Sequence, residues 1–218
     1  MNLIRYAEAD LPTAHGPFRL VVYRDAADAD SDSTTVEEHM AIVRGDIDGV
    51  GNVLCRVHSE CWTSEVIGSL KCDCREQLDA ALERIAAEGT GLVVYLRQEG
   101  RGIGLGNKVR AYALQNDGAD TVEANLALGF EADSRRYDLA AAILEDQGVR
   151  SIRLLTNNPL KVAGLRSAGV MVAERIAHWV GENQHNANYL AIKRRKMGHH
   201  PDQPAQLRAL SSARARKG

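Results

Sequence analysis

Three cysteines in the first half of the chain have spacing that suggests a metal site. Cys61, Cys72 and Cys74 form the pattern C-x10-C-x-C, whereas Cys55 lies in the apolar run VLCRV and is typical of a small buried side chain. Structural zinc is usually closed by four protein ligands, and catalytic zinc often has three, with water in the fourth position. Three thiolates favour an open site. The spacing alone also allows a closed site with His58 as fourth ligand, or cysteines that fill the core.

The segment His58-Ser59-Glu60 offers a second interpretation of the same cysteines. A pattern H-x-E followed by paired cysteines is typical of zinc nucleobase deaminases, in which the histidine binds the metal and the glutamate transfers protons. The match is incomplete, because that pattern ends in P-C-x-x-C and here a single residue separates Cys72 from Cys74. A deaminase is therefore the weaker alternative.

The segment QEGRGIGLGNK at residues 98–108 contains a predicted glycine-rich loop, residues 99–106, between a predicted strand and a predicted helix. Such a segment can bring backbone N–H groups and a helix N-terminus close to an anion. It matches neither G-x-x-x-x-G-K-[ST] nor G-x-G-x-x-G, so the glycines alone are equally consistent with a tight turn. The flanking Arg97, Arg101 and Lys108 favour phosphate, because guanidinium and ammonium groups match phosphate oxygens.

Two further polar clusters accompany predicted turns. Asp133 and Arg135 precede a predicted helix, and an isolated aspartate there is typical of a helix N-terminus. The segment TNNP at residues 156–159 follows the carboxyl end of a predicted strand, with Lys161 just beyond. Ligands bind at that end of the strands in α/β sheets, although an ordinary capped turn gives the same pattern.

The elements that must position these residues alternate along most of the chain. We predict an α/β fold: a single domain with a mixed sheet flanked by helices, in which N-terminal strands are followed by alternating strands and helices. Residues 25–38, acidic and small, predict a solvated loop. The predicted strands are residues 18–23, 40–44, 53–57, 91–97, 151–155 and 170–176, and the predicted helices are residues 75–88, 107–116, 136–147 and 160–168.

Composition restricts the classes of function. The 218 residues include 27 basic and 29 acidic side chains, a net charge of −2, so the cationic field that nucleic acid requires is missing. No run of about 18 apolar residues and no signal-like N-terminus occurs, and we therefore expect a cytoplasmic protein that does not bind a membrane. Residues 201–218 lack an apolar face and predict a disordered basic tail after a domain of residues 1–200.

Six motifs occur in order along the chain: RVHSEC at 56–61, KCDC at 71–74, RQEGRGIGL at 97–105, NKVRAYALQ at 107–115, DTVEAN at 120–125 and LLTNNP at 154–159. In sequence and in spacing they resemble GTP cyclohydrolase II, a zinc hydrolase of riboflavin biosynthesis. The resemblance extends to NANYLAIKRRKMGH at 186–199, and it is weaker at AHWVG, residues 177–181.

The resemblance implies a reaction and its cofactors. The family hydrolyses GTP at C8 of guanine, releases formate and pyrophosphate, and forms 2,5-diamino-6-ribosylamino-4(3H)-pyrimidinone 5′-phosphate in the first step of riboflavin biosynthesis. By resemblance, Cys61, Cys72 and Cys74 bind one Zn²⁺ per subunit, water completes its coordination, and Mg²⁺ accompanies the triphosphate. A homodimer is also implied.

The resemblance assigns site residues as well. Asp133 falls at the position of the proposed proton acceptor, Arg135 at that of the proposed nucleophile, and Tyr112 at an active-site tyrosine. The positions that contact GTP are Arg56, Val57, His58, Ser59, Glu60, Gln77, Glu99, Gly100, Arg101, Thr121, Thr156 and Lys161. Since guanidinium stays protonated in ordinary settings, stabilisation of transition-state charge is the alternative role for Arg135. The same residues are compatible with a paralogue that retains formate or pyrophosphate, and with a nucleotide-binding module without turnover.

Overall fold

The computed structural model describes residues 3–28, 31, 36–116, 121–130, 134–187 and 189–191. Within them, one seven-stranded sheet has the order β1-β2-β3-β5-β4-β6-β7. The strands are β1 (Leu3–Thr13), β2 (Gly16–Asp25), β3 (His39–Arg44), β4 (Val53–Ser59), β5 (Gly91–Leu96), β6 (Ile152–Leu155) and β7 (Val172–Ile176). The helices are α1 (Trp62–Glu65), α2 (Cys74–Glu88), α3 (Glu99–Gly102), α4 (Gly104–Asn116), α5 (Thr121–Ala127), α6 (Asp138–Asp146) and α7 (Pro159–Ser167), with a 3₁₀ turn at Ala26–Asp28.

The sheet has an antiparallel half and a parallel half that meet at β5. Strands β1, β2, β3 and β5 pair antiparallel in succession. Strand β4 runs parallel to both β5 and β6, and β7 runs parallel to β6. The predicted mixed sheet is therefore confirmed. Because the carboxyl ends of β4, β5 and β6 meet at one edge, the loops that follow these strands lie close together there.

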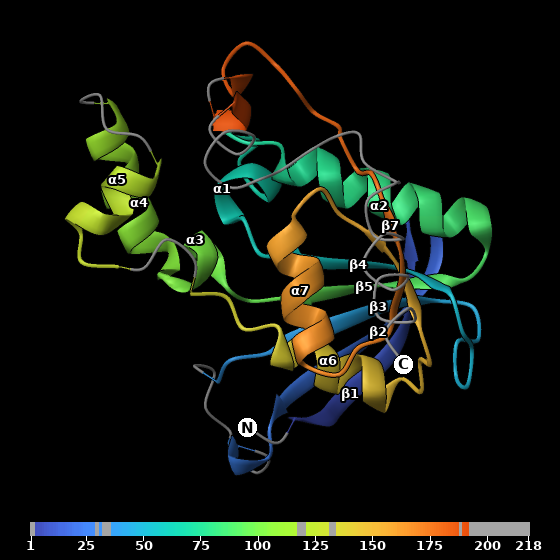
Figure 1. Cartoon of the computed structure of the whole chain (residues 1–218). Helices are drawn as coiled ribbons and strands as arrows, with labels where there is room; N and C mark the ends of the chain where they lie inside the picture. The colour runs from blue at the N-terminus through green and yellow to red at the C-terminus, as the bar shows by residue number, and fades with distance from the viewer. Residues whose placement is uncertain are drawn as a thin grey trace, which may run out of the picture.

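Helices cover both faces of the sheet (Figure 1). On one face, α6 and α7 pack through Ile143, Leu165 and their neighbours against β4, β5 and β6, and on the other α2 packs through Ala81 and Ile85 against Leu54. The helical spacing of its apolar residues predicts α2 well, and Gly89 ends it in a left-handed conformation with φ of 82°. Both apolar layers fix the strand ends that carry the candidate site.

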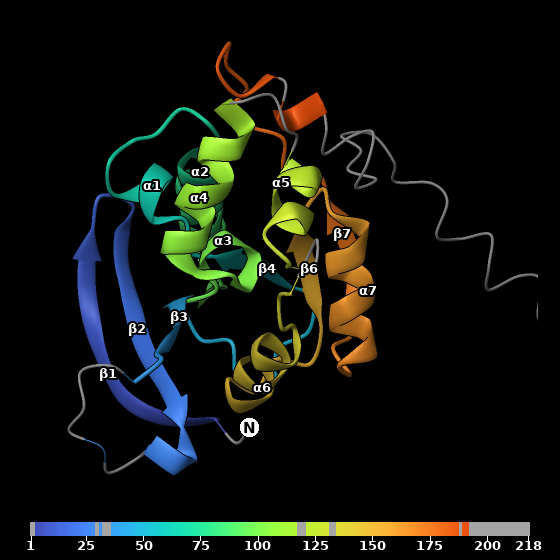
Figure 2. The same ribbon diagram turned by 90° about the vertical axis from the view of Figure 1, so that its left-hand side faces the viewer.

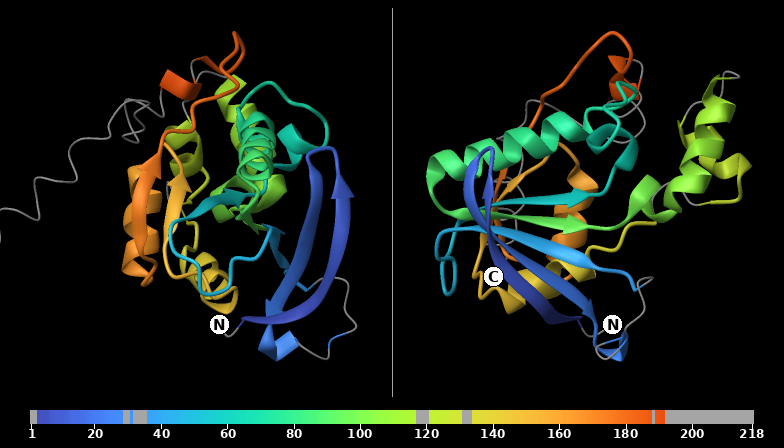
Figure 3. Two further views of the ribbon diagram at one scale, coloured as in Figure 1. Left: turned by 90° about the vertical axis from the view of Figure 1, so that its right-hand side faces the viewer. Right: turned by 180° about the vertical axis from the view of Figure 1, so that it is seen from behind.

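Two parts of the fold differ from a compact α/β layer. The hairpin of β1 and β2 is long and curved, as Figure 2 and Figure 3 show from opposite sides. Strand β1 is exposed from Arg5 to Thr13, so it lacks the apolar alternation that predicts a strand, and the sequence pattern missed it. Helices α4 and α5 project to one side of the sheet (Figure 1).

The predicted loop over residues 99–106 is wrong in part. The single turn α3 occupies its first residues, and α4 begins at Gly104, three residues before the predicted helix start. Gly100 and Arg101 lie within α3 and both have left-handed backbone conformations, with φ of 63° and 66°, so this turn is not a regular α-helix. The remaining predicted helices and strands are found with small shifts of their ends, whereas α1 and α5 were not predicted.

Some predictions fall outside the described residues. These are Asp133, the tail at 201–218 and part of the loop at 25–38, of which β2 and the 3₁₀ turn take residues 25–28. In the described part of the chain, every helix is too short or too polar to span a bilayer.

Candidate active site

One cavity lies at the edge of the sheet where the carboxyl ends of the central strands meet. Strand β4 contributes His58, the β6–α7 loop contributes Thr156, and α4 contributes Tyr112. The three cysteines of the predicted metal site line the same cavity. Residues far apart in the sequence are thus brought together by the parallel half of the sheet and by α4.

The cysteines form a compact cluster. Cys61 and Cys72 place their sulfurs 3.5 Å apart, and the sulfurs of all three cysteines lie within 4.8 Å of one another. Zinc–sulfur bonds of about 2.3 Å in a tetrahedron would separate two sulfurs by about 3.8 Å. The donor set and its dimensions therefore fit zinc. His58 does not belong to this cluster, and Cys55 is fully buried away from it, as predicted.

The environment of the cluster favours thiolate at Cys61. Hydrogen bonding to Cys72 and Cys74 lowers the pKa of Cys61 well below its ordinary value, with Lys108 adding to the effect. The same contacts with Cys61 raise the pKa of Cys72 and of Cys74. Cys61 is therefore the first of the three to lose its proton, and a cation at the cluster would favour loss of the other two.

Lys108 and Glu99 contact the turn at Cys61 and Trp62, called here the Cys61 loop. Lys108 Nζ lies 3.0 Å from Cys61 Sγ and 2.7 Å from Glu99 Oε1, and Glu99 Oε2 accepts a 2.6 Å hydrogen bond from the backbone N–H of Trp62. Burial lowers the pKa of Lys108, but the negative charge of Cys61 and the hydrogen bond to Glu99 outweigh it and raise that pKa. Lys108 is therefore a fixed positive charge beside the sulfur.

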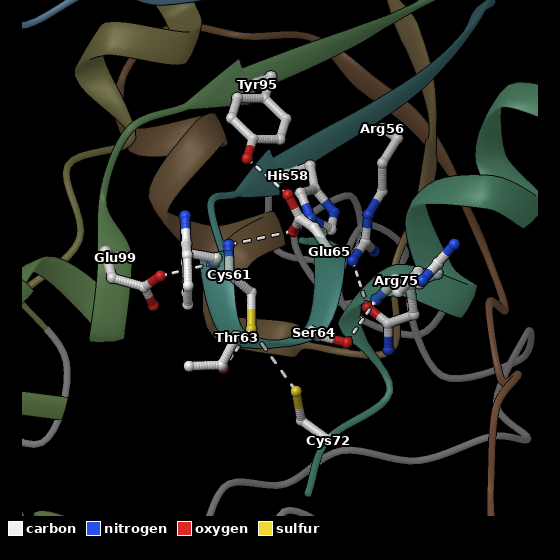
Figure 4. A network of polar contacts seen from close by, with 12 residues as sticks. Arg56, His58, Cys61, Thr63, Ser64, Glu65, Cys72, Arg75, Tyr95 and Glu99 are labelled. Carbon is white, nitrogen blue, oxygen red and sulfur yellow. Dashed lines mark hydrogen bonds and ion pairs between the residues drawn. The ribbon is translucent and has the colours of Figure 1, made fainter. Parts of the chain in front are cut away.

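Glu65, one turn after Cys61, holds the other side of the loop. Its Oε1 accepts hydrogen bonds from the Cys61 backbone N–H at 3.0 Å and from His58 Nε2 at 2.7 Å, and its Oε2 accepts one from Tyr95 Oη at 2.5 Å (Figure 4). Burial lowers the pKa of His58, so the neutral ring is the resident form. The carboxylate thus connects Cys61 to β4 and β5.

Arg56 is a buried cation on β4. It donates to Leu155 O at 2.9 Å and to Gln77 Oε1, and Gln77 Nε2 donates to Asp73 Oδ2 at 2.5 Å. Burial lowers the pKa of Arg56 to about 10, which still leaves the guanidinium charged at neutral pH. His178, in the segment that resembles the family least, donates from Nε2 to the backbone oxygen of Gln77 at 2.7 Å.

The TNNP segment forms the turn between β6 and α7. Asn158 caps α7, because its Oδ1 accepts a 2.9 Å hydrogen bond from Leu160 N, and Pro159 takes the first helical position. Lys161 is 4% exposed and donates from Nζ to Val57 O at 2.5 Å, which places a second buried cation at the cavity.

Several buried polar atoms at the cavity have no hydrogen-bond partner among the described residues. They are Arg56 Nε, His58 Nδ1, Ser59 Oγ and Asn158 Nδ2. Unpaired buried polar atoms are costly and rare in native proteins, and they gather at sites where a ligand supplies the missing partner. A non-glycine residue with positive φ, Arg101, also lines this cavity, and such backbone strain is concentrated at functional sites.

The structure brings most of the site residues predicted from the sequence to this one cavity. Besides the three cysteines, the predicted residues that line it are Arg56, His58, Ser59, Gln77, Gly100, Arg101, Tyr112, Arg135, Thr156 and Lys161. Val57, Glu60 and Glu99 do not line it, because Val57 belongs to the apolar core and the two glutamates line a second cavity. Thr121 begins α5 with its side chain outside the description, and Asp133 is not described.

Sequence reasoning missed Glu65 and Tyr95, and it suggested phosphate for Lys108, whose contacts in the structure are with Cys61 and Glu99. Lys108 and Tyr112 are four residues apart on α4 and therefore share a helical face, which was a usable signal. No comparable pattern pointed to Glu65, because its partners come from β4, β5 and its own turn.

Comparison with known proteins shows the family to which the chain belongs. The family model for GTP cyclohydrolase II matches residues 4–177. GTP cyclohydrolase-2 of Actinobacillus succinogenes is 51% identical over 196 residues, which cover 90% of this chain and 87% of that protein. GTP cyclohydrolase-2 of Proteus mirabilis is 51% identical over 199 residues, 91% of this chain and 96% of that protein.

A longer relative aligns over part of its length. The riboflavin biosynthesis protein RibBA of Nocardia farcinica is 52% identical over 91% of this chain and 46% of that protein. With the family model matching most of the chain and relatives at this level of identity, the chain belongs to the GTP cyclohydrolase II family and is a hydrolase of riboflavin biosynthesis.

Proposed function

We propose that this chain hydrolyses GTP at C8 of guanine, releases formate and pyrophosphate, and forms 2,5-diamino-6-ribosylamino-4(3H)-pyrimidinone 5′-phosphate. The observation that carries the proposal is the position of the three-cysteine cluster, which opens onto a cavity lined by cations and by unpaired buried polar atoms. Ring opening needs an activated water, which a metal at the cysteines would supply. Binding of the triphosphate needs positive charge, which the cations of the same cavity supply.

Cys61, Cys72 and Cys74 would hold the zinc ion. Three protein ligands are typical of catalytic zinc and four of structural zinc, and the described residues offer three. When bound, zinc supplies Lewis-acid chemistry that makes water a nucleophile near neutral pH. Glu65 and Glu99 help to keep the ligands in place, because they accept hydrogen bonds from the backbone N–H groups of Cys61 and Trp62, respectively.

The cations of the cavity suit the triphosphate and its Mg²⁺. Arg101, Arg135 and Lys161 lie around the cavity, and Lys71 Nζ lies 4.9 Å from the ring centre of Tyr112. Arginine and lysine neutralise the charge that develops on a leaving pyrophosphate. We assign GTP contacts to the predicted residues that line the cavity, including His58 and Ser59, whose unpaired polar atoms a ligand would satisfy.

Three residues are proposed for the chemical steps. Tyr112 lines the cavity, Lys71 and Lys108 both lie over its ring, and its hydroxyl is kept protonated because burial raises its pKa. It is therefore suited to donate a hydrogen bond to the reacting ring. Arg135 stabilises negative charge at the phosphates, as its position on the cavity permits, and Asp133, two residues earlier, is the proposed proton acceptor.

The test is an incubation of the zinc-loaded protein with GTP and Mg²⁺. Formate, pyrophosphate and the ultraviolet spectrum of the pyrimidine product are followed in the same sample. Equal amounts of formate and pyrophosphate support the proposal. A formylated product without formate would indicate a specialised paralogue, ammonia would indicate a deaminase, and unchanged GTP would indicate a binding module; each of these results contradicts it.

A further inference from the structure

Lys108 lies beside the three-cysteine cluster, where the charges of a zinc ion and three thiolates would not cancel. Three thiolates and one divalent cation sum to a net charge of −1, and the described residues place Lys108 Nζ 3.0 Å from Cys61 Sγ. The side chain of Lys108 is 12% exposed, so the interaction is screened less than it would be at the surface. A positive charge at this distance offsets the surplus.

Lys108 also links the Cys61 sulfur to the Glu99 carboxylate. Its second contact is Glu99 Oε1. The Glu99 carboxylate also accepts hydrogen bonds from the backbone N–H groups of Gly100 at 2.8 Å and Trp62 at 2.6 Å. The Glu99 side chain is 8% exposed, so the ammonium and the carboxylate form a buried ion pair. The chain Cys61–Lys108–Glu99–Trp62 closes on the turn that carries Cys61 and holds its sulfur toward the cluster.

We propose that Lys108 is a positioning residue of the metal site, which neutralises the three-thiolate cluster and hydrogen-bonds Cys61, and is not a phosphate ligand. The proposal rests on the zinc site of the proposed function. A thiolate that accepts a hydrogen bond donates less charge to its metal, so the metal remains a stronger Lewis acid. Lys108 therefore contributes both to metal affinity and to the electronic character of the bound metal.

Lys71 offers a matched control. It faces the same cavity and, like Lys108, lies over the ring of Tyr112, with ring-centre distances of 4.9 Å and 5.7 Å respectively. Its Nζ donates to Asn116 Oδ1 at 2.7 Å in an exposed setting. Replacing Lys71 by methionine removes a positive charge from the cavity and leaves the Lys108 contact with sulfur in place.

The test compares Lys108→Met, Lys108→Arg and Lys71→Met with the wild type. Zinc affinity is measured without GTP by competition with a chromophoric chelator. Methionine replaces Lys108 because it keeps an unbranched aliphatic side chain and removes only the charge. We expect Lys108→Met to weaken zinc binding by about 10- to 100-fold, the usual cost of losing a partner of a metal ligand. Lys108→Arg recovers part of the loss, and Lys71→Met binds zinc much like the wild type.

A second readout separates a positioning role from general loss of structure. In cobalt-substituted protein, the sulfur-to-cobalt charge-transfer absorption reports the electron donation of the thiolates. We expect Lys108→Met to move this absorption to lower energy, since Cys61 then lacks its hydrogen-bond donor, and Lys71→Met to leave it in place. If Lys108→Met does not fold, Lys108→Arg still tests the proposal through the same absorption and affinity.

The outcomes distinguish this proposal from the proposed function. Wild-type zinc affinity and an unshifted cobalt spectrum in Lys108→Met, together with a raised KM for GTP, would overturn the positioning role and make Lys108 a phosphate contact, while the zinc site would stand. Failure of the wild-type protein to bind zinc would overturn both.

Discussion

Replacing His178 by leucine is expected to reverse the order of stability between neutral and acidic pH. The His178 ring is 1% exposed, and its Nε2 must carry the proton because Gln77 O, 2.7 Å away, can only accept. Protonation would add a second N–H at Nδ1, a buried atom without a hydrogen-bond partner among the described residues. Burial, and then the positive charge of Arg56, lower the pKa of His178 from 6.5 to about 3.

The size of the effect follows from this shift. Because the folded pKa lies below the unfolded one, the contribution of the neutral ring is complete above pH 6.5 and is lost progressively as the pH falls toward 3. At pH 5 the loss is about 2 kcal/mol, since each unit between the pH and the unfolded pKa costs about 1.4 kcal/mol. His178→Leu does not titrate, and its lost hydrogen bond costs about 1 kcal/mol at every pH.

The assay is urea unfolding of the wild type and His178→Leu at pH 8 and pH 5. We expect the variant to be less stable by about 1 kcal/mol at pH 8 and more stable by about 1 kcal/mol at pH 5. Other groups that titrate in this range, such as His58, are common to both proteins and cancel in the difference. His178→Gln, which also does not titrate, should show the same pH dependence. A difference between variant and wild type that is equal at the two pH values would refute the reasoning.

Three further predictions concern the frame and the metal site. Gly91→Ala should destabilise the fold by about 3 kcal/mol in thermal unfolding, because its Cβ would lie 2.6 Å from a backbone oxygen of β4, whereas Gly89→Ala, whose Cβ meets no described atom within 4 Å, should cost about 1 kcal/mol. Cys61→Ser should lose bound zinc and formate release, while Cys55→Ala retains both, as zinc analysis and turnover will show. Glu65→Ala should cost about 3 kcal/mol or more by leaving three donors unpaired, and Glu65→Gln, which keeps an acceptor, should cost less in urea unfolding.

A specific result would contradict each of these three predictions. Equal losses in the two glycine variants would remove the steric argument at Gly91. Zinc retained by Cys61→Ser, or lost by Cys55→Ala, would contradict the ligand assignment. Equal destabilisation by the two Glu65 variants would show that the carboxylate does not hold the Cys61 loop through its hydrogen bonds.

The central elements of the fold were predictable because their patterns are local. Strand β5 is a continuous apolar run and β4 is mostly apolar as far as Val57, as buried parallel strands are, and α2 carries apolar residues at helical spacing with a glycine at its end. Strand β1 escaped prediction because it is an exposed edge strand, whose stability comes from pairing with β2 and not from an apolar face.

Some features of the site could also be predicted from local patterns, and others could not. The cysteines could be recognised by residue type and spacing, but spacing did not decide between three and four ligands; the structure separates His58 from the cluster by pairing it with Glu65. The partner of Lys108 could not be deduced either. A lysine beside a glycine-rich segment fits phosphate and thiolate equally well until the fold places Cys61 next to it.

We propose that the three-cysteine cluster binds the metal required for ring opening. The most direct measurement removes metal with a chelator, adds zinc back in steps, and records formate release from GTP at each step. We predict no formate from the metal-free protein and a linear rise that saturates at one zinc per chain. Full formate release from protein that contains no metal would show that ring opening does not depend on a metal at the cysteine cluster.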